Sequence, residues 1–299
     1  MFARFIMGIS LYLLLGPLFA ATPLVSADWL GANLHRPGLV VLDLQPNATY
    51  RRYHVPGAVH SDYDDWRTAN AVGTAKMLPP VARLEQLIGG LGIDNESQVV
   101  LVITGRSASE MASAARVYWS FKALGHDRVS ILDGGLLAYA NQRGNRMEGG
   151  VVTPRQKRFK AQPRAEYLVD AETVKAALND GTPLIDNRSD AEHLGLLSGG
   201  GKERAGTIPG ARSLPFNWLT VNGGVQFHSE RNLRRIYRAA GVPLSGAQIS
   251  FCHTGHRTAL AWFVSHELLG NSEARLYDGS TAEWAANPTL PIERKIELE

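Results

Sequence analysis

The segment Ser250-Phe-Cys-His-Thr-Gly-His-Arg-Thr258 contains the only cysteine of the 299-residue chain. The residues from Ile249 to Phe251 predict a buried strand before the cysteine, and apolar residues recur at helical spacing from Leu260 to Leu268 behind it. A turn this tight requires Gly255, because glycine adopts backbone conformations that other residues avoid. The segment therefore predicts a strand, a short loop and a helix, with Cys252 at the carboxyl end of the strand.

One series of landmarks occurs twice in the chain. An apolar run ending in aspartate, a Pro-Gly-Ala segment, a Leu-Gly pair and an Asp-Gly pair follow in the same order in both halves. The paired landmarks, separated by 143 to 153 residues, are Asp43 and Asp186, Val55 and Ile208, Gly125 and Gly270, and Asp133 and Asp278. Two copies of one fold are predicted, the second with an insertion at Gly195–Arg204.

Each copy alternates strand-like runs, such as Val99 to Ile103, with helical patterns. Since parallel strands need crossover helices, this alternation predicts an α/β fold in both halves, each a mostly parallel sheet flanked by helices. The stretch from Gly144 to Arg164 shows neither period and is rich in Gly, Pro and Arg, which is typical of a linker. We place the first domain at 22–146, the linker at 147–168 and the second domain at 169–299.

The composition, with 44% hydrophobic and 20% charged residues, excludes disordered and collagen-like chains. One cysteine excludes an internal disulfide framework. The net charge is only +3, and the basic residues are scattered apart from Arg155 to Lys160, which we interpret as part of the linker. We therefore expect no nucleic-acid partner, because that would need a concentrated basic stripe.

Residues 1–21 have the pattern of a secretory signal peptide, with Arg4, an apolar stretch from Phe5 to Leu15, and alanines at the expected cleavage site. The alternative is an uncleaved membrane anchor, but that needs about 20 apolar residues and Gly16-Pro17 interrupts the stretch. We expect export to a periplasm, without stable membrane insertion after processing. A free thiol is a liability in an oxidising space, so Cys252 is expected to have a function.

The predicted loop is suited to holding an anion. The first N–H groups of a helix lack intrahelical acceptors and lie at the positive end of its dipole. These groups stabilise a thiolate, and Arg257 adds a second positive charge. Cys252 is therefore the expected nucleophile; the opposing interpretation is a small buried hydrophobic residue at a strand end.

The paired halves, the segments His54-Val-Pro-Gly-Ala58 and Thr207-Ile-Pro-Gly-Ala211, and Cys252 opening a six-residue loop resemble the tandem-domain rhodaneses. The segment Ala274–Trp284 is similar to the C-terminal signature of that family, and departs from it at Thr281, where an aromatic residue is usual. The resemblance covers nearly all of the chain after the signal peptide. It implies a catalytic second domain and an inactive first domain, in which Thr104 ends the equivalent strand.

The resemblance implies a sulfurtransferase with ping-pong kinetics. The Cys252 thiolate would attack the outer sulfur of thiosulfate, release sulfite, and pass the resulting persulfide sulfur to cyanide, a thiol or a periplasmic acceptor protein. Arg188 matches the family arginine that contacts the donor anion, and Arg257 is expected to bind substrate or stabilise the loop. The other expected substrate-binding residues are His253, Thr254, Gly255 and His256.

Three other functions are left open. Thr254 stands where 3-mercaptopyruvate-type relatives have a serine, which allows that donor; against it, Glu192, His193 and Leu194 replace the second arginine that would bind its carboxylate. A second possibility is a non-enzymatic persulfide carrier, with the first domain and Gly199–Gly201 docking the partner. The third is a phosphatase or arsenate reductase, whose loop in the related phosphatases is one residue longer.

Cys252, His253 and His256 are three potential metal ligands within five residues. In an anion-binding loop, however, the amides point inward and the side chains radiate outward. We therefore expect no metal and no other cofactor.

Some side chains admit a structural interpretation as well. Arg257 would then pair with a carboxylate such as Glu283, Arg188 would fix the insertion, and His54 would bond to backbone. The remaining expectations are strand-end aspartates that accept loop N–H groups (Asp43, Asp133, Asp186, Asp278), core aromatics (Trp262, Phe263) and pocket-wall aromatics (Phe216, Trp218).

Overall fold

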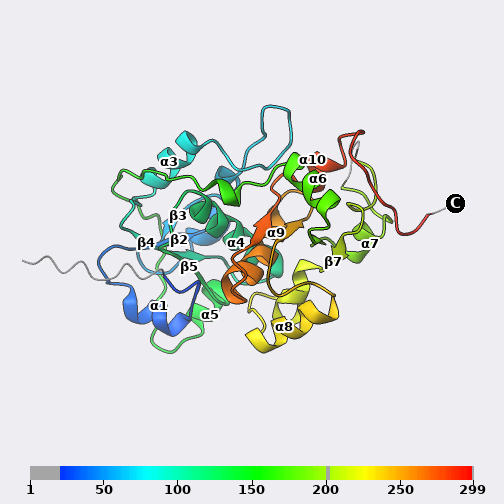
Figure 1. The fold of residues 1–299 in the computed structure, drawn as a ribbon. Coiled ribbons are helices and arrows are strands. Elements are labelled where there is room, and N and C mark those ends of the chain that lie inside the picture. Colours follow the sequence, from blue (N-terminus) through cyan, green and yellow to red (C-terminus); the bar gives the residue numbers. More distant parts are fainter. Residues whose placement is uncertain (1–20, 200–202, 298–299) are drawn as a thin grey trace, which may run out of the picture.

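The structure, a computed structural model, describes residues 21–199 and 203–297. Two α/β domains lie side by side, the first in blue to green and the second in light green to red (Figure 1). The predicted signal peptide falls outside the described residues except for position 21. Within them, no helix has the length and apolar character needed to cross a bilayer.

The first domain contains a five-stranded sheet in which every strand pair is parallel, in the order β1-β5-β4-β2-β3. The strands are β1 (Leu24–Val25), β2 (Leu39–Asp43), β3 (Val59–His60), β4 (Gln98–Val102) and β5 (Val129–Leu132). The helices are α1 (Ala27–Asn33), α2 (Asn47–Tyr50), α3 (Val81–Gly90), α4 (Ala108–Ala123) and α5 (Gly135–Ala140).

The second domain contains a four-stranded parallel sheet in the order β7-β6-β8-β9. The strands are β6 (Leu184–Asp186), β7 (Arg212–Ser213), β8 (Gln248–Phe251) and β9 (Ala274–Leu276). The helices are α6 (Ala171–Asp180), α7 (Asp190–His193), α8 (Glu230–Ala239), α9 (His256–Phe263), which continues as a π-helical turn to Leu268, and α10 (Ser280–Trp284).

The two sheets have one topology. A single parallel bridge between Val169 and Tyr277 takes the place that the β1–β5 pair has in the first domain. With it, the strand order of the second sheet repeats that of the first. The prediction of two tandem α/β domains with parallel sheets is confirmed.

Helices α4 and α9 pack against each other at the centre of the molecule (Figure 1). Tyr118 of α4 meets Phe263 of α9 edge to face, with ring centroids 4.9 Å apart, and one hydrophobic cluster runs through both domains. Trp262 and Phe263 are buried, as predicted. Because the interface is a continuous core, the domains hold each other in a fixed arrangement.

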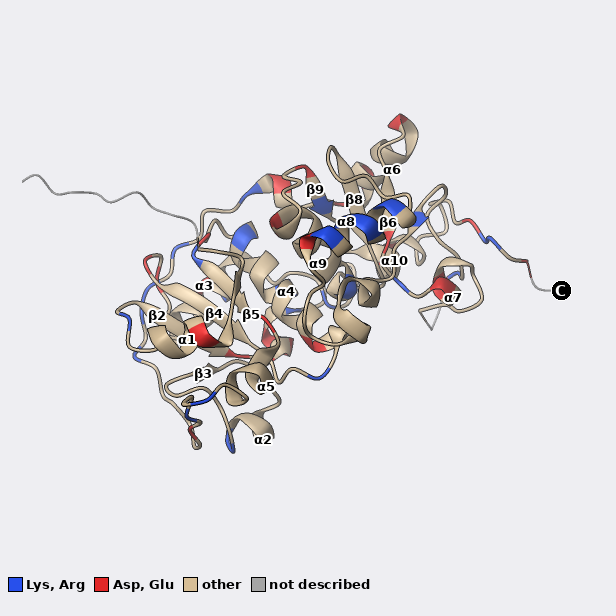
Figure 2. Cartoon of the chain, turned by 90° about the horizontal axis from the view of Figure 1, so that it is seen from below, with Lys and Arg blue, Asp and Glu red and all other residues tan. Residues whose placement is uncertain are grey.

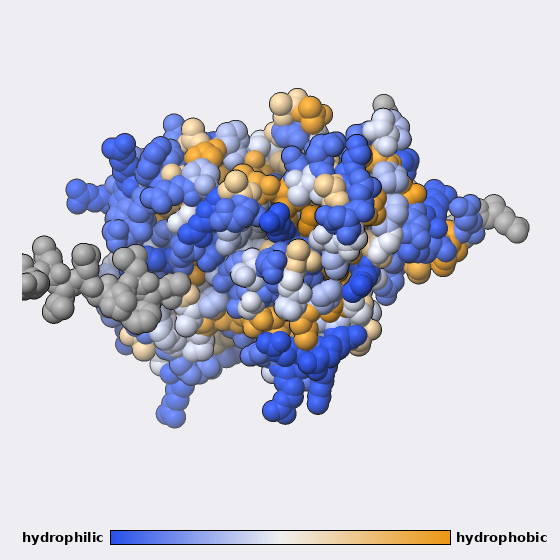
Figure 3. Space-filling view, viewed as in Figure 1, coloured by the Kyte–Doolittle hydropathy of each residue, from blue (hydrophilic) through white to orange (hydrophobic). Residues whose placement is uncertain are grey.

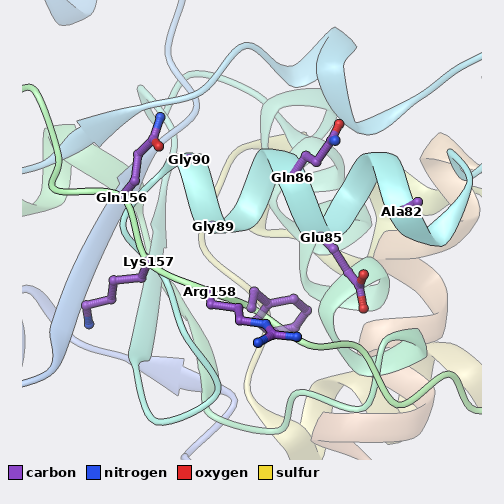
Figure 4. A pocket seen from close by; sticks show the side chains of 9 residues that line it. Ala82, Glu85, Gln86, Gly89, Gly90, Gln156, Lys157 and Arg158 are labelled. Carbon is purple, nitrogen blue, oxygen red and sulfur yellow. The ribbon is translucent and has the colours of Figure 1, made fainter.

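The linker has no regular structure over 151–164 and packs along the first domain. Lys157 N–H donates to the Gly89 carbonyl at 2.9 Å, and Phe159 is buried against the core. A pocket of about 540 Å³ lies between α3 and this segment of the linker (Figure 4), and none of its lining residues belongs to the second domain. The linker thus packs across α3.

Basic residues gather on α8, which Figure 2 shows in blue. Arg231, Arg235 and Arg238 are exposed there at spacings that share one helix face, a cluster that the sequence analysis did not single out. The face shown in Figure 3 is mostly hydrophilic, with several separate hydrophobic areas.

The contact between linker and α3 can be tested with two neighbouring glycines. A Cβ on Gly89 would lie 2.6 Å from the Lys157 carbonyl oxygen, whereas one on Gly90 would meet nothing within 4 Å. We expect Gly89→Ala to lower the free energy of unfolding by about 1–3 kcal/mol through overpacking. Gly90→Ala should be neutral or stabilising by up to about 1 kcal/mol. Urea unfolding measures the stability of both variants. Equal effects would mean that the linker does not pack closely against α3 at Gly89.

Candidate active site

Cys252 is the first residue after β8 and begins the loop that leads into α9. Its N–H donates to Ser280 Oγ at 3.1 Å, and the Gly255 N–H donates to the same oxygen at 3.2 Å. The Ser280 hydroxyl itself donates to the Tyr277 carbonyl at 2.8 Å. One hydroxyl therefore uses its donor and both lone pairs to fix the two ends of the Cys252–Gly255 turn.

The loop contains four further backbone amides. In the described part of the chain, the N–H groups of His253, Thr254, His256 and Arg257 have no hydrogen-bond acceptor. Unpaired N–H groups at the start of a helix form an anion site. This arrangement supports the prediction that the loop holds a sulfur anion, and it leaves half-buried Thr254 among the groups available to that anion.

The turn requires a glycine, as predicted. Gly255 has φ = 69°, and a Cβ there would overlap Nη1 of Arg116 and lie 2.7 Å from Asp278 Oδ1. Both the backbone conformation and the close approach of α4 exclude a side chain at this position.

Arg188 is buried, two residues after the end of β6. Its guanidinium donates to both carboxylate oxygens of Asp186, at 2.9 and 2.7 Å, and to the Gly206 carbonyl at 2.7 Å. Burial raises the pKa of Asp186, but hydrogen bonds from His193 and Arg188 and the arginine charge outweigh it, and the pKa falls to about 2. Arg188 therefore ties the chain after the insertion to the end of β6, and its contact with a donor stays a prediction.

Arg257 makes a bidentate ion pair with Glu192, at 2.6 and 2.8 Å. Glu192 belongs to the capping box of α7 with Ser189, so its position is fixed. Burial raises the pKa of Glu192, but Arg257 lowers it to about 2, so the carboxylate is charged near neutral pH. The suggested partner Glu283 is wrong, because that carboxylate accepts the Tyr277 hydroxyl at 2.6 Å.

The two loop histidines point to different parts of the molecule. His253 Nε2 lies 2.8 Å from Glu203, in the insertion, so the insertion packs directly on the loop. His256 faces the first domain, with Nδ1 2.6 Å from Tyr63 Oη and Nε2 3.1 Å from Ser109 Oγ. Among the described residues, no three side chains of His, Cys, Asp or Glu form a group that could hold a metal ion.

Burial and, to a smaller extent, the charges of nearby arginines lower the pKa of His256 to about 3. The imidazole is therefore neutral near pH 7, with one nitrogen that donates and one that accepts. Tyr63 and Ser109 have hydroxyls that fit either role. His256 is thus a neutral contact between the catalytic loop and the first domain.

The first domain has no thiol in the equivalent position. The Thr281 and Ala282 amides donate to the carbonyls of Cys252 and His253, and the Leu136 and Leu137 amides donate in the same way to Ile103 and Thr104. Ile103 therefore lies where the second domain has Cys252, which corrects the expected equivalence with Thr104. Strand β4 ends at Val102, one residue earlier than the prediction placed it, and the loop before α4 is one residue longer than the loop before α9.

Other side chains behave as the structural interpretations predict. His54 Nδ1 lies 2.7 Å from the Tyr50 carbonyl, which is the expected backbone bond. All four strand-end aspartates accept backbone N–H groups; Asp43 and Asp186 accept them within their own turns, while Asp133 and Asp278 accept them from the other domain. Trp218 is exposed and Phe216 half-buried.

The family model described as the Rhodanese-like domain matches this chain twice, over residues 26–142 and 170–287. The chain belongs to the rhodanese family. A Mycobacterium bovis protein provisionally named a thiosulfate sulfurtransferase is 32% identical over 277 residues, which cover 90% of this chain and 97% of that protein. The mitochondrial thiosulfate/3-mercaptopyruvate sulfurtransferase 1 of Arabidopsis thaliana is 32% identical and covers 91% of this chain and 78% of its own.

The crystal structure of SseA from Escherichia coli, described as a 3-mercaptopyruvate sulfotransferase with the rhodanese fold, is also similar. It has a TM-score of 0.74 and 25% identity, and the match covers 87% of this chain and 99% of that one. The predictions of a tandem rhodanese and of a sulfurtransferase are confirmed by these matches. The donors in the names differ, since thiosulfate occurs in two and 3-mercaptopyruvate in two.

The role of Ser280 predicts a measurable loss of function. Ser280→Ala removes the acceptor that holds the Cys252 and Gly255 amides, and we expect sulfur transfer to fall about tenfold or more because the loop amides lose their alignment. Thr281→Val is a matched control, since the buried Thr281 hydroxyl has no partner in the described structure. Steady-state kinetics measures both variants. Equal effects would show that Ser280 does not hold the loop.

Proposed function

We propose that the protein transfers sulfane sulfur from thiosulfate to a thiophilic acceptor through a persulfide on Cys252. The observation that carries the proposal is the loop itself, in which a strand-end thiol begins a turn with four amides that have no acceptor among the described residues. Donor and persulfide are both anions, so one set of N–H groups can stabilise each in turn.

The reaction needs two displacements at sulfur. In the first, the Cys252 thiolate forms a bond to the outer sulfur of thiosulfate, and sulfite leaves with the electron pair of the broken S–S bond. In the second, cyanide or a thiolate attacks the terminal persulfide sulfur, and the cysteine thiolate leaves. No electrons are gained or lost overall, so neither step requires a redox cofactor.

The charges around the loop favour thiosulfate over 3-mercaptopyruvate. The Arg257 fork is occupied by the Glu192 carboxylate, and the Arg188 fork by Asp186. A donor carboxylate would have to displace one of these bidentate partners, whereas a compact sulfonate can use the loop amides. The proposal also places the enzyme in the periplasm, on the signal-peptide pattern of residues 1–21, where a thiol or an acceptor protein would accept the sulfur.

The donor and the nucleophile can be tested together by intact mass. Thiosulfate should add the mass of one sulfur atom to the intact protein, and cyanide should remove it and yield thiocyanate. Cys252→Ala should abolish both, because no other cysteine is present.

Three results would contradict the proposal. Unchanged thiocyanate formation by Cys252→Ala would exclude the nucleophile. A kcat/KM higher with 3-mercaptopyruvate than with thiosulfate would show that 3-mercaptopyruvate is the preferred donor. Appreciable turnover of a phenyl phosphate would point to the phosphatase alternative.

A further inference from the structure

We propose that Arg116, on α4 of the first domain, is a positioning residue that holds the Cys252 loop in its anion-binding conformation. The proposal rests on the sulfur-transfer function proposed above and adds a role for the domain that lacks a nucleophile. Arg116 has 0% exposure, and its side chain crosses the interface between the domains. There, Nη1 donates to the Gly255 carbonyl at 3.3 Å and lies 2.5 Å from Asp278 Oδ1.

The contact with the Gly255 carbonyl determines where the next amide points. A peptide group is planar and trans, so its C=O and N–H point in opposite directions. Arg116 holds the Gly255 oxygen toward α4, and the His256 N–H of the same peptide group must therefore point away from α4. That N–H is one of the four loop amides without an acceptor in the described chain.

A flipped peptide would reverse this dipole. Glycine at Gly255 is tolerant of backbone rotation, so the loop sequence alone does not prevent the flip. A carbonyl oxygen would then replace an N–H beside the sulfur anion, exchanging an attraction for a repulsion. A fixed guanidinium on the carbonyl side removes that alternative.

Asp278 ties the same arginine to the rest of the site. Its second oxygen accepts the Leu78 N–H of the first domain at 2.7 Å, so two groups of the first domain contact this carboxylate of the second. Two residues further on, Ser280 fixes the Cys252 and Gly255 amides. Arg116 therefore contacts two segments that shape the loop. One is the loop backbone at Gly255, and the other is the segment from Asp278 to Ser280.

The neighbouring loop residue is held by the same domain. His256 contacts Tyr63 and Ser109, both from the first domain. The first domain thus contacts both the carbonyl of Gly255 and the side chain of His256. The remaining nitrogens of Arg116, Nε and Nη2, have no acceptor in the described structure, and the guanidinium lies over the Trp119 ring at 4.7 Å. A buried cation with so few partners is costly for folding, which suits a functional role.

Lys122 provides a matched control on the same helix. It is also nearly buried, and it also reaches an acid of the second domain, with Nζ 3.6 Å from Glu267. None of its contacts in the described residues involves the loop. Lys122→Met and Arg116→Met each remove one interfacial cation of α4, but only Arg116→Met frees the Gly255 carbonyl.

The experiment compares the KM for thiosulfate, kcat and the thermal midpoint of the two variants in the full chain. We expect Arg116→Met to raise KM for thiosulfate and lower kcat/KM about 10- to 100-fold. This is less than the roughly 100- to 1,000-fold cost of removing a preorganised donor outright, because Arg116 acts on the His256 N–H only through the peptide group. Lys122→Met should stay within about twofold in both constants, although both variants lose thermal stability. Arg116→Lys, which keeps the charge but not the fork, should fall between wild type and Arg116→Met.

Equal kinetic effects of Arg116→Met and Lys122→Met would overturn the proposal, because they would show a loss of interface stability only. If Arg116→Met does not fold, a folded Arg116→Lys with wild-type KM would overturn it as well. Alkylation of Cys252 by iodoacetamide separates this test from the donor assignment, since it needs no thiosulfate. We expect it to slow in Arg116→Met and not in Lys122→Met, even if thiosulfate proves to be the wrong donor.

Discussion

Backbone N–H groups must converge on one point after β8 if a sulfur anion is to be held there, and the rest of the structure serves that requirement. A peptide group carries no net charge, so neighbouring groups must fix the direction of its dipole. Ser280, the first residue of α10, imposes it by accepting two amide N–H groups, and the αL conformation of Gly255 allows the chain to turn within four residues. Within the part of the chain that the structure describes, four amides then remain for the ligand.

The domain interface explains why a copy without a thiol is retained in the structure. Asp133 and Asp278 are equivalent by the repeat, and each accepts a backbone N–H from the opposite domain, that of Phe227 or Leu78. Helices α4 and α9 are equivalent as well and pack against each other. The interface thus has the form of a two-fold contact between two copies of one domain. Its symmetry is broken at the loops, where Ile103 replaces the nucleophile and Arg116 approaches Gly255.

Much of the fold followed from the sequence because its signals are local. Strand runs, helical spacing and the repeated landmarks predicted two parallel α/β domains and placed Cys252 at a strand end. The partners of the polar side chains did not follow, because they come from distant segments. Arg257 pairs with Glu192, 65 residues earlier, instead of the suggested Glu283. Ser280 lay inside a recognised signature, but its role depends on β8 and β9 being neighbours. Arg116 gave no signal, since its helix pattern does not show which arginine faces another domain.

The central claim is that the amides of His253, Thr254, His256 and Arg257 bind the sulfur carried by Cys252. The most direct test is the backbone amide spectrum of ¹⁵N-labelled protein before and after stoichiometric thiosulfate. We predict that these four amide protons move downfield when the persulfide forms, whereas the Cys252 and Gly255 amide protons, which already donate to Ser280, move least within the loop. Unchanged shifts at the four residues, with sulfur present on Cys252, would contradict it.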